Sequence, residues 1–479
     1  MRNRPAPVLV PFLALSTLSV AGQPVRRQLE NKDVTQTTAA RLLLGQAKAS
    51  ALKIKNSFQR GLVLDEIGAA QAKLGDVDAA VETANQAYPH IMTTLAAVGE
   101  QLGNSNDLLK AQAIGSKLKG GGSSTVFAFI SRRQAEKGNI EEALRTTEQI
   151  QAPEVRSDAL EWIAQQQAAN GKYSGARKTL ALATAADPTR HSTPDEVEMM
   201  IADAQLARGD VQTARAIVAS MKSPEARSDA MIGFAAALWE KGDKAGAAVW
   251  LEDALRELPT GPSYEFSRYF AIPIQVKLGQ KERAMEAAGA LSREMRVKGY
   301  MAVAVTCAEA KDIACVGEAV EKMASAGSSE GEDKELSDFG LKLMILNVTA
   351  ALIDNAQFEA ADRLLKTVEQ RVDDVSGKSF IEPHAQLQRV FMLAQQERFE
   401  NARALALKIR PDSVADVQRG TALRTTAVLQ TKKSGVVSSR SWASALADDE
   451  DRAYALLGIA QALLKIGEVK LPYSAIQVH

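Results

Sequence analysis

The sequence predicts an all-α protein, built as a solenoid of about eleven stacked helix pairs. Three observations carry this prediction. A glycine-centred pattern recurs along the chain, alanine is abundant, and aromatic residues make up only 5% of the 479 residues. With 15 prolines in the whole chain, few positions interrupt a helix. A solenoid of this length forms its core repeat by repeat and does not need separate globular domains.

The repeated pattern sets the position of each helix pair. Six glycines have an alanine five residues later, and five of the six have glutamine four residues earlier. They are Gly75, Gly138, Gly171, Gly209, Gly242 and Gly279. From Gly138 to Gly242 the steps are 33, 38 and 33 residues, which is the period of a stacked helix–turn–helix array. Each glycine is predicted to end the first helix of a pair in a left-handed cap.

The predicted organisation follows this register and its interruptions. It comprises an export signal over 1–21, a linker over 22–34, a regular solenoid over 35–325, a linker or hinge over 326–335, and an irregular solenoid over 336–479. The hinge rests on the Gly/Ser/Glu-rich composition of Ser325–Glu335. The last helix, Asp451–Ile466, has no following partner because Pro472 interrupts the next stretch, so it is predicted to be a carboxy-terminal cap.

The amino terminus has the layout of a secretory signal peptide. Two arginines, Arg2 and Arg4, precede an apolar run from Val8 to Val20, and small residues at Ser19–Ala21 offer a cleavage site before Gly22. The run is too short to span a membrane comfortably. We therefore expect an exported protein, periplasmic or secreted. The alternative is an apolar leader on a cytosolic protein.

The two cysteines, Cys307 and Cys315, flank a predicted turn at Lys311-Asp312. Equivalent positions on an antiparallel helix pair come close together, so an exported protein could join them in a disulfide. The alternative is a pair of free, buried thiols.

Charge and chemistry narrow the function classes. Lys+Arg and Asp+Glu each number 58, and no basic stripe is visible, so a nucleic-acid partner is not expected. The four histidines are scattered without the spacing of metal ligands, and no nucleophile motif occurs. We therefore expect no metal, no cofactor, no catalytic residues and no integral membrane span.

One repeat resembles the tetratricopeptide family. In "LDEIGAAQAKLGDVDAA", Leu64–Ala80, the small and apolar residues, the Gly-Asp turn and the final alanine stand where that family's pattern has them. The resemblance covers about residues 57–290 and continues more weakly to about 467. It departs from the pattern in having glutamine where an aromatic residue is usual, and in lacking most repeat-end prolines.

The resemblance implies a right-handed superhelix that binds a peptide or protein in its concave groove and has no catalytic activity. The groove-facing offsets of the family map onto Asp65, Glu66, Phe129, Asp158, Glu161, Trp162, Met199, Asp203, Asp229, Trp239, Tyr269 and Phe270. Such an acidic and aromatic set suits an extended ligand with basic and apolar side chains. Trp162 and Trp239 are candidate anchors; the alternative is that both fill gaps between repeats.

Two other functions remain open. A cytosolic regulatory repeat domain would follow if the leader is not a signal. An all-α enzyme of helical-toroid type, acting on polysaccharide, would need a cleft rich in aromatic residues and paired acids. The aromatics are few, and a period of 33–38 residues favours an open array over a closed ring.

Overall fold

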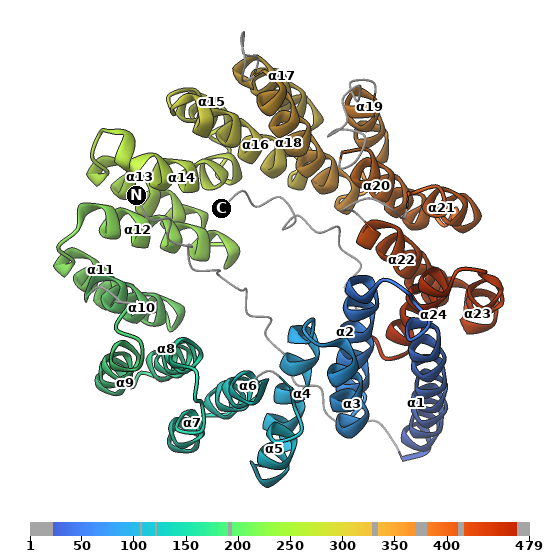
Figure 1. Cartoon of the computed structure of the whole chain (residues 1–479). Helices are drawn as coiled ribbons and strands as arrows, with labels where there is room; N and C mark the ends of the chain where they lie inside the picture. Colours follow the sequence, from blue (N-terminus) through green and yellow to red (C-terminus); the bar gives the residue numbers. More distant parts are fainter. Residues whose placement is uncertain are drawn as a thin grey trace.

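Helix pairs arranged in a closed ring make up the protein, as seen in a computed structural model (Figure 1). The described residues are 23–105, 108–119, 122–189, 194–327, 334–369, 381–410 and 416–466. They contain 24 α-helices and one short 3₁₀ helix, and no β-strand. This confirms the all-α solenoid. The predicted signal, 1–21, and residues 328–333 of the predicted hinge lie outside the described residues.

Two layers of helices form the wall of the ring (Figure 1). The inner layer is α2 (Ser57–Lys73), α4 (Met92–Ser105), α6 (Gly122–Glu136), α8 (Pro153–Ala169), α10 (Pro194–Ala207), α12 (Pro224–Glu240), α14 (Glu265–Lys277), α16 (Arg293–Glu309), α18 (Lys334–Asp354), α20 (Glu382–Gln395), α22 (Asp416–Ser434) and α24 (Asp449–Leu463). The outer layer is α1 (Gln23–Ala51), α3 (Val77–Ala87), α5 (Leu108–Gly115), α7 (Ile140–Thr147), α9 (Tyr173–Ala186), α11 (Val211–Ser220), α13 (Lys244–Glu257), α15 (Lys281–Gly289), α17 (Ile313–Gly327), α19 (Phe358–Glu369), α21 (Phe399–Ala406) and α23 (Val436–Ala445). The 3₁₀ helix η1 (Pro262–Tyr264) precedes α14.

The inner helices end in a recurring left-handed cap. All six register glycines have positive φ, between 77° and 89°. The N–H of the following residue donates to the carbonyl four residues before the glycine, as Asp76 does to Gln71 at 3.0 Å. The same cap occurs later in the chain without glycine, at Lys311, Ala356, Glu397 and Lys465. These four positions lack the glycine signal, although the backbone conformation is the same.

The recurring glutamine ties the two helices of a pair together. Gln71 on α2 accepts a hydrogen bond from the hydroxyl of Thr83 on α3 at 2.8 Å, and Gln134 accepts one from Thr146 at 2.7 Å. All four side chains are buried. A buried amide oxygen is costly without a donor, and in these two pairs the threonine twelve residues later supplies it. The Oε1 atoms of Gln167 and Gln275 are buried and have no hydrogen-bond partner among the described residues.

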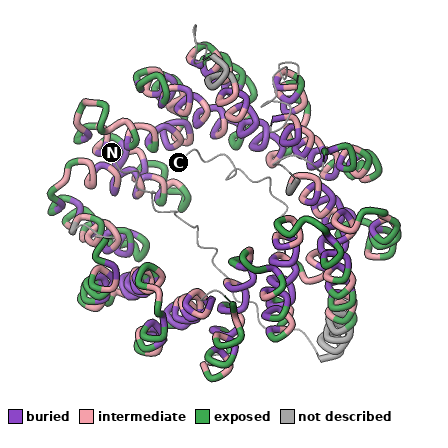
Figure 2. The backbone as a smooth tube through the Cα atoms, viewed as in Figure 1, coloured by how far each residue is buried: buried purple, intermediate pink, exposed green. Residues whose placement is uncertain are grey.

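The core lies between the two layers, where Figure 2 shows the buried residues. The alanines five residues after the turn glycines are fully buried, with 0% exposure at Ala80, Ala143 and Ala176. Because alanine has a single methyl group, the outer helix approaches the inner one closely there. A larger residue would overpack the contact at a cost of roughly 1–3 kcal/mol.

A disulfide joins Cys307 on α16 to Cys315 on α17, with Cα atoms 5.9 Å apart. The bond spans the turn at Lys311 and links the two helices of one pair. Asp312 lies inside the closed loop and accepts hydrogen bonds from the Cys315 N–H and from Lys281 on α15. The turn is therefore held by the disulfide on one side and by the neighbouring pair on the other.

The ring closes through the two ends of the chain. Helix α24 packs on α1 as extensively as the helices of a pair pack on each other, and it also contacts α22 and α2. One hydrophobic cluster contains Leu43 and Leu44 of α1 together with Tyr454 and Leu457 of α24. Helix α1 is therefore the outer partner that α24 lacks in the sequence, and the closing pair is shared between the chain ends.

This closure differs from the open array expected from the sequence. The repeat period fixes the size of one helix pair, but closure depends on the small rotation accumulated from pair to pair and on complementary ends. The segment 22–34, expected as a linker, is helical from Gln23 onward as the beginning of α1.

Candidate functional site

The residues expected to bind a ligand lie on the inner helices, and three of them are engaged in holding the ring together. Asp65 on α2 is buried, and its carboxylate accepts hydrogen bonds from the N–H groups of Thr93 and Thr94 at 3.0 and 2.8 Å. These donors belong to the first turn of α4. Asp65 therefore caps the next inner helix, a structural role.

Glu66 forms an ion pair with Arg424 of α22 across the seam of the ring. Both side chains are one-quarter exposed. Burial lowers the pKa of Arg424, and the Tyr454 phenol opposes this shift. The pair links the first and the eleventh inner helix, which the sequence places 358 residues apart.

Trp239 packs between two inner helices. Its indole N–H donates to the carbonyl of Lys277 at 3.1 Å, and the Lys277 ammonium lies 4.7 Å from the ring centre. Lys277 also pairs with Glu240 at 3.2 Å. These contacts give Trp239 a structural role between α12 and α14, the alternative that the sequence left open.

Trp162 on α8 also contacts the neighbouring inner helix, but its indole N–H makes no hydrogen bond there. The Arg132 guanidinium of α6 lies over its ring at 3.5 Å from the centre, a cation–π contact. The indole nitrogen is buried and has no hydrogen-bond partner among the described residues. Phe129 lies half-buried on α6, packed closely against Gly99 of α4.

Two acids of the inner wall have raised pKa values. Asp203 on α10 is exposed inside the ring, and desolvation by the surrounding protein raises its pKa to about 7. Desolvation also raises the pKa of Asp229 on α12, and a hydrogen bond from Ser267 opposes the shift. The Oδ1 atom of Asp229 is buried and has no partner among the described residues.

Aromatic surface lies next to these acids on α14. Tyr269 and Phe270 form an edge-to-face pair with centroids 5.5 Å apart, and burial raises the pKa of the Tyr269 phenol. Phe270 is 47% exposed, and Phe266, one turn earlier, is 61% exposed. Phe266 was not among the residues predicted from the sequence, although its spacing of four from Phe270 places both on one helix face.

The remaining predicted residues lie on neighbouring inner helices. Four consecutive inner helices, α8, α10, α12 and α14, pack side by side around the ring. We give the name central inner surface to these residues of the four helices: Asp158, Glu161, Trp162, Met199, Asp203, Asp229, Phe266, Tyr269 and Phe270. Asp158 is exposed, and Glu161 and Met199 are half-buried. Asp65, Glu66, Phe129 and Trp239 are not part of this surface.

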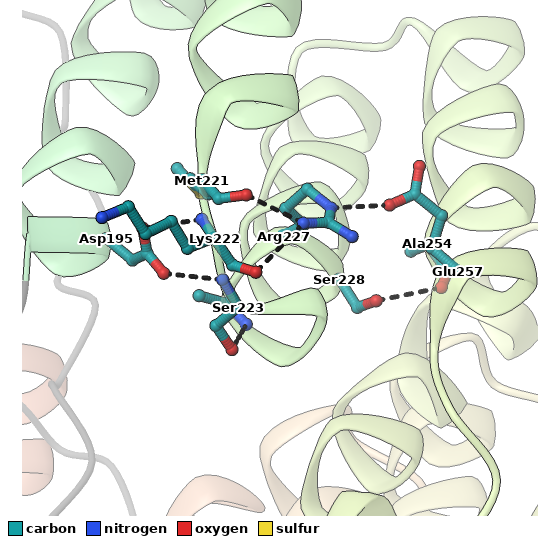
Figure 3. Close-up of polar contacts among 9 residues, drawn as sticks. Asp195, Met221, Lys222, Ser223, Arg227, Ser228, Ala254 and Glu257 are labelled. Carbon is teal, nitrogen blue, oxygen red and sulfur yellow. Dashed lines mark hydrogen bonds and ion pairs between the residues drawn. The ribbon is translucent and has the colours of Figure 1, made fainter.

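A recurring arginine is also structural (Figure 3). Arg227 donates to the carbonyl of Met221 at 2.8 Å and pairs with Glu257 at 2.9 Å. In the same loop Asp195 accepts from the N–H groups of Lys222 and Ser223. Glu257 belongs to the same helix pair as Arg227. Arg60 and Arg452 donate in the same way to the carbonyls of Ile54 and Leu446, six residues earlier, so this recurring arginine holds the loop before its helix.

Other kinds of site were sought among the described residues. No group of three His, Cys, Asp or Glu side chains there is placed to hold a metal ion. Of the helices described, none is both long and apolar enough to cross a membrane. A shallow cavity of about 380 Å³ lies between α5, α6 and α7, lined by Leu108, Phe127 and Arg145 among others.

Comparisons with known proteins add only weak likenesses. No family model and no curated protein matches the chain. Two solved structures align with low similarity. "Structure of Naa15/Naa10 bound to HypK-THB" is 14% identical, with 76% of this chain and 64% of that chain covered and a TM-score of 0.23. "Circular tandem repeat protein with novel repeat topology and enhanced subunit contact surfaces" is 12% identical, covering 89% and 84%, with a TM-score of 0.17. This chain thus spans less than two thirds of the first of these structures.

Proposed function

We propose that the protein is an exported, non-catalytic repeat scaffold that binds an extended protein or peptide segment through its central inner surface. The ligand carries alternating basic and apolar side chains. The observation that carries this proposal is the placement of Asp229 on α12 against α14, which carries the exposed Phe266 and Phe270, with Asp203 on α10 at the other side of α12.

Desolvation raises the pKa values of both Asp203 and Asp229. A carboxylate whose pKa is raised by burial is stabilised by a nearby cation, because the cation replaces lost hydration with Coulombic attraction. A lysine or arginine of the ligand next to Asp229 would also give Oδ1 a hydrogen-bond donor. The neighbouring phenylalanines supply apolar contacts for the alternate side chains.

Binding of a defined peptide to the full chain tests this proposal. The probe is a fluorescent 12-residue peptide that alternates lysine and phenylalanine, and the comparison peptide has glutamate in place of lysine. We expect fluorescence anisotropy to show binding of the basic peptide only. The double variant Asp203→Asn/Asp229→Asn should weaken that binding at least tenfold.

Two outer acids provide the matched control. Glu318 lies on α17, 60% exposed, and its side chain pairs with Lys322. Glu318→Gln/Glu321→Gln removes two negative charges from the outer wall, as many as the inner double variant removes, and we expect it to leave the affinity unchanged. Equal losses of peptide affinity in the inner and outer variants would show that the effect comes from net charge alone. Failure of the basic peptide to bind at all would reject the proposed ligand class.

The helical-toroid enzyme gains one argument from the closed ring, because the sequence had disfavoured it on the expectation of an open array. A turnover assay on soluble polysaccharides separates the two functions. Release of reducing ends by the wild type, abolished in Asp203→Asn/Asp229→Asn, would overturn the non-catalytic proposal. Peptide binding without turnover supports the scaffold.

Export rests on the leader sequence alone. We expect the protein isolated from its native cells to begin at Gly22, which mass spectrometry of the amino-terminal peptide measures. An intact Met1–Ala21 on the mature chain would favour the cytosolic regulatory repeat domain.

A further inference from the structure

We propose that the seam of the ring is a helix-binding site that accepts α1 either from its own chain or from a second copy of the chain. The partner is an amphipathic helix with the apolar stripe of α1. This inference goes beyond ligand binding at the central inner surface and does not depend on it.

The face of α1 that meets the seam is sharply defined. Leu43 and Leu44 are each 1% exposed, and Ala47 and Ala51 are completely buried, at 0% exposure. Leu42, next to Leu43 in the sequence, is 53% exposed. The buried positions follow helical spacing, so α1 presents one apolar stripe to the seam.

The receiving surface belongs to the other end of the chain. Residues Ala453 to Ala460 of α24 are nearly all buried, because α24 lies between α22, α2 and α1. Arg452 donates to the hydroxyl of Ser50 at 3.1 Å, which adds a polar contact at the end of the α1 stripe. Closure of the ring thus rests on a helix that the sequence places about 400 residues from its site.

Few contacts tie α1 to its own first repeat. Among the described residues, its ion pairs to that repeat are Arg41–Asp76 and Lys48–Glu82, at 2.8 and 2.9 Å, each with at least one exposed partner. Exposed pairs of this kind contribute roughly 0.2–1 kcal/mol each. The connection to α2, residues 52–56, is short and mostly exposed.

These features meet the conditions for exchange of an element between copies. The α1–α24 contacts are identical whether α1 comes from the same chain or from another, so exchange costs little once the connection has turned outward. Exchange then depends on concentration, and two copies that swap α1 form a dimer of twice 51.4 kDa.

A synthetic peptide of residues 23–51 tests the site in the full chain. The Leu43→Asp/Leu44→Asp chain has a disabled α1 and an intact receiving surface. We expect it to bind the labelled peptide at least 100-fold more tightly than the Leu42→Asp chain, whose own α1 stays docked. A peptide carrying Leu43→Asp/Leu44→Asp should not bind either chain.

Hydrogen exchange checks that the Leu43→Asp/Leu44→Asp chain remains folded away from the seam. The amides of α12 and α14 in the Leu43→Asp/Leu44→Asp chain should stay as protected as in the wild type, since each repeat contacts only its neighbours. Should that chain lose this protection, the milder Ala47→Glu chain takes its place. Equal peptide binding by the disabled and the Leu42→Asp chains, or binding of the mutant peptide, would overturn the helix-binding site.

Exchange of α1 between two copies of the chain is tested with the wild-type protein. Refolding at high concentration should give a species of twice 51.4 kDa by light scattering, and an excess of the 23–51 peptide during refolding should prevent it. A dimer that forms regardless of the peptide, or a monomer at every concentration, would show that α1 does not exchange between copies.

Discussion

At the scale of single residues, the left-handed cap is the conformation of most described turns within the helix pairs, from Gly75 to Glu397. Gly242 has a φ of 85° and open space around the position of a β-carbon, so only its backbone conformation opposes substitution. Ala356 adopts the same conformation, with a φ of 59°, in spite of its β-carbon. These two positions form a matched pair.

We predict that Gly242→Ala destabilises the protein by roughly 1 kcal/mol, because a left-handed L-residue costs about 1–2 kcal/mol. Ala356→Gly should act in the opposite direction, reduced by the larger chain entropy of unfolded glycine. Thermal unfolding followed by circular dichroism measures both. A stabilising Gly242→Ala would mean that the turn tolerates another backbone conformation.

The pH dependence at Asp203 has a definite sign. Its pKa is higher in the folded protein than in the unfolded chain, so the folded state binds more protons between these two values and stability falls as pH rises through them. We predict that Asp203→Asn is more stable than the wild type at pH 8 and that this difference disappears toward pH 4. Denaturant unfolding at both pH values measures it; a difference independent of pH would contradict the shift.

Residue roles were only partly predictable from the sequence. The offsets implied by the tetratricopeptide resemblance predicted Asp65, Glu66, Trp239 and Asp203 as groove residues of the first helix of each pair, and all four lie on inner helices. It did not show that Asp65 caps α4 or that Glu66 meets Arg424, since those partners come from other repeats. Asp203 differs from them in being exposed inside the ring.

At the scale of helices, the loops between repeats are held by carboxylates that cap a neighbouring element. The two backbone hydrogen bonds to Asp195 lower the pKa of its carboxyl group. We predict that Asp195→Ala lowers stability by about 1 kcal/mol, the usual value of a lost cap, while Asp195→Asn retains an acceptor and costs less. Thermal unfolding compares the two. Equal losses would assign the effect to charge alone.

The disulfide strengthens one helix pair. Closing a short loop between Cys307 and Cys315 reduces the entropy of the unfolded chain, with an expected stabilisation of about 2 kcal/mol in the chain-entropy description. We predict that a reductant lowers the unfolding temperature of the wild type and has no effect on Cys307→Ala/Cys315→Ala. An equal response of both proteins would contradict a structural role for the bond.

Helix pairs were the most predictable level of structure. Glycine, alanine and the apolar spacing locate the pairs from Gly75 to Gly279, because each signal is local. The later pairs have Lys311, Ala356 and Glu397 in the turn, so the glycine signal was absent there although the backbone cap was kept. Pair number was nevertheless close, at eleven sequential pairs plus the one shared by α24 and α1.

At the scale of the whole molecule, the Glu66–Arg424 pair is a test of closure. We predict that Glu66→Ala increases hydrogen exchange in α1 and α24, because it leaves a largely desolvated guanidinium without its partner. Arg424→Met in the same chain should restore part of the protection. The affinity for the basic peptide at the central inner surface should stay unchanged. A loss of that affinity in Glu66→Ala would show that Glu66 also contributes to ligand binding.

Closure itself could not be predicted from the repeat pattern. The match between α1 and α24 involves residues such as Leu43 and Tyr454, whose hydrophobicity is ordinary for any core helix. Only the sum of small rotations over the entire array brings them together. The missing partner of the last helix was visible in the sequence, but nothing local indicated that the first helix would supply it.

A linear solenoid unravels from its two terminal repeats, which have a neighbour on one side only. Here each inner helix has a neighbour on both sides, and the first and last helices lie against each other. The chain could therefore be connected in a different order while each helix pair keeps the same neighbours in the ring. A gene that joined the two ends and began at an exposed inter-repeat loop, such as the one around Gly261, would encode a permuted chain with the same sequence of neighbours around the wall.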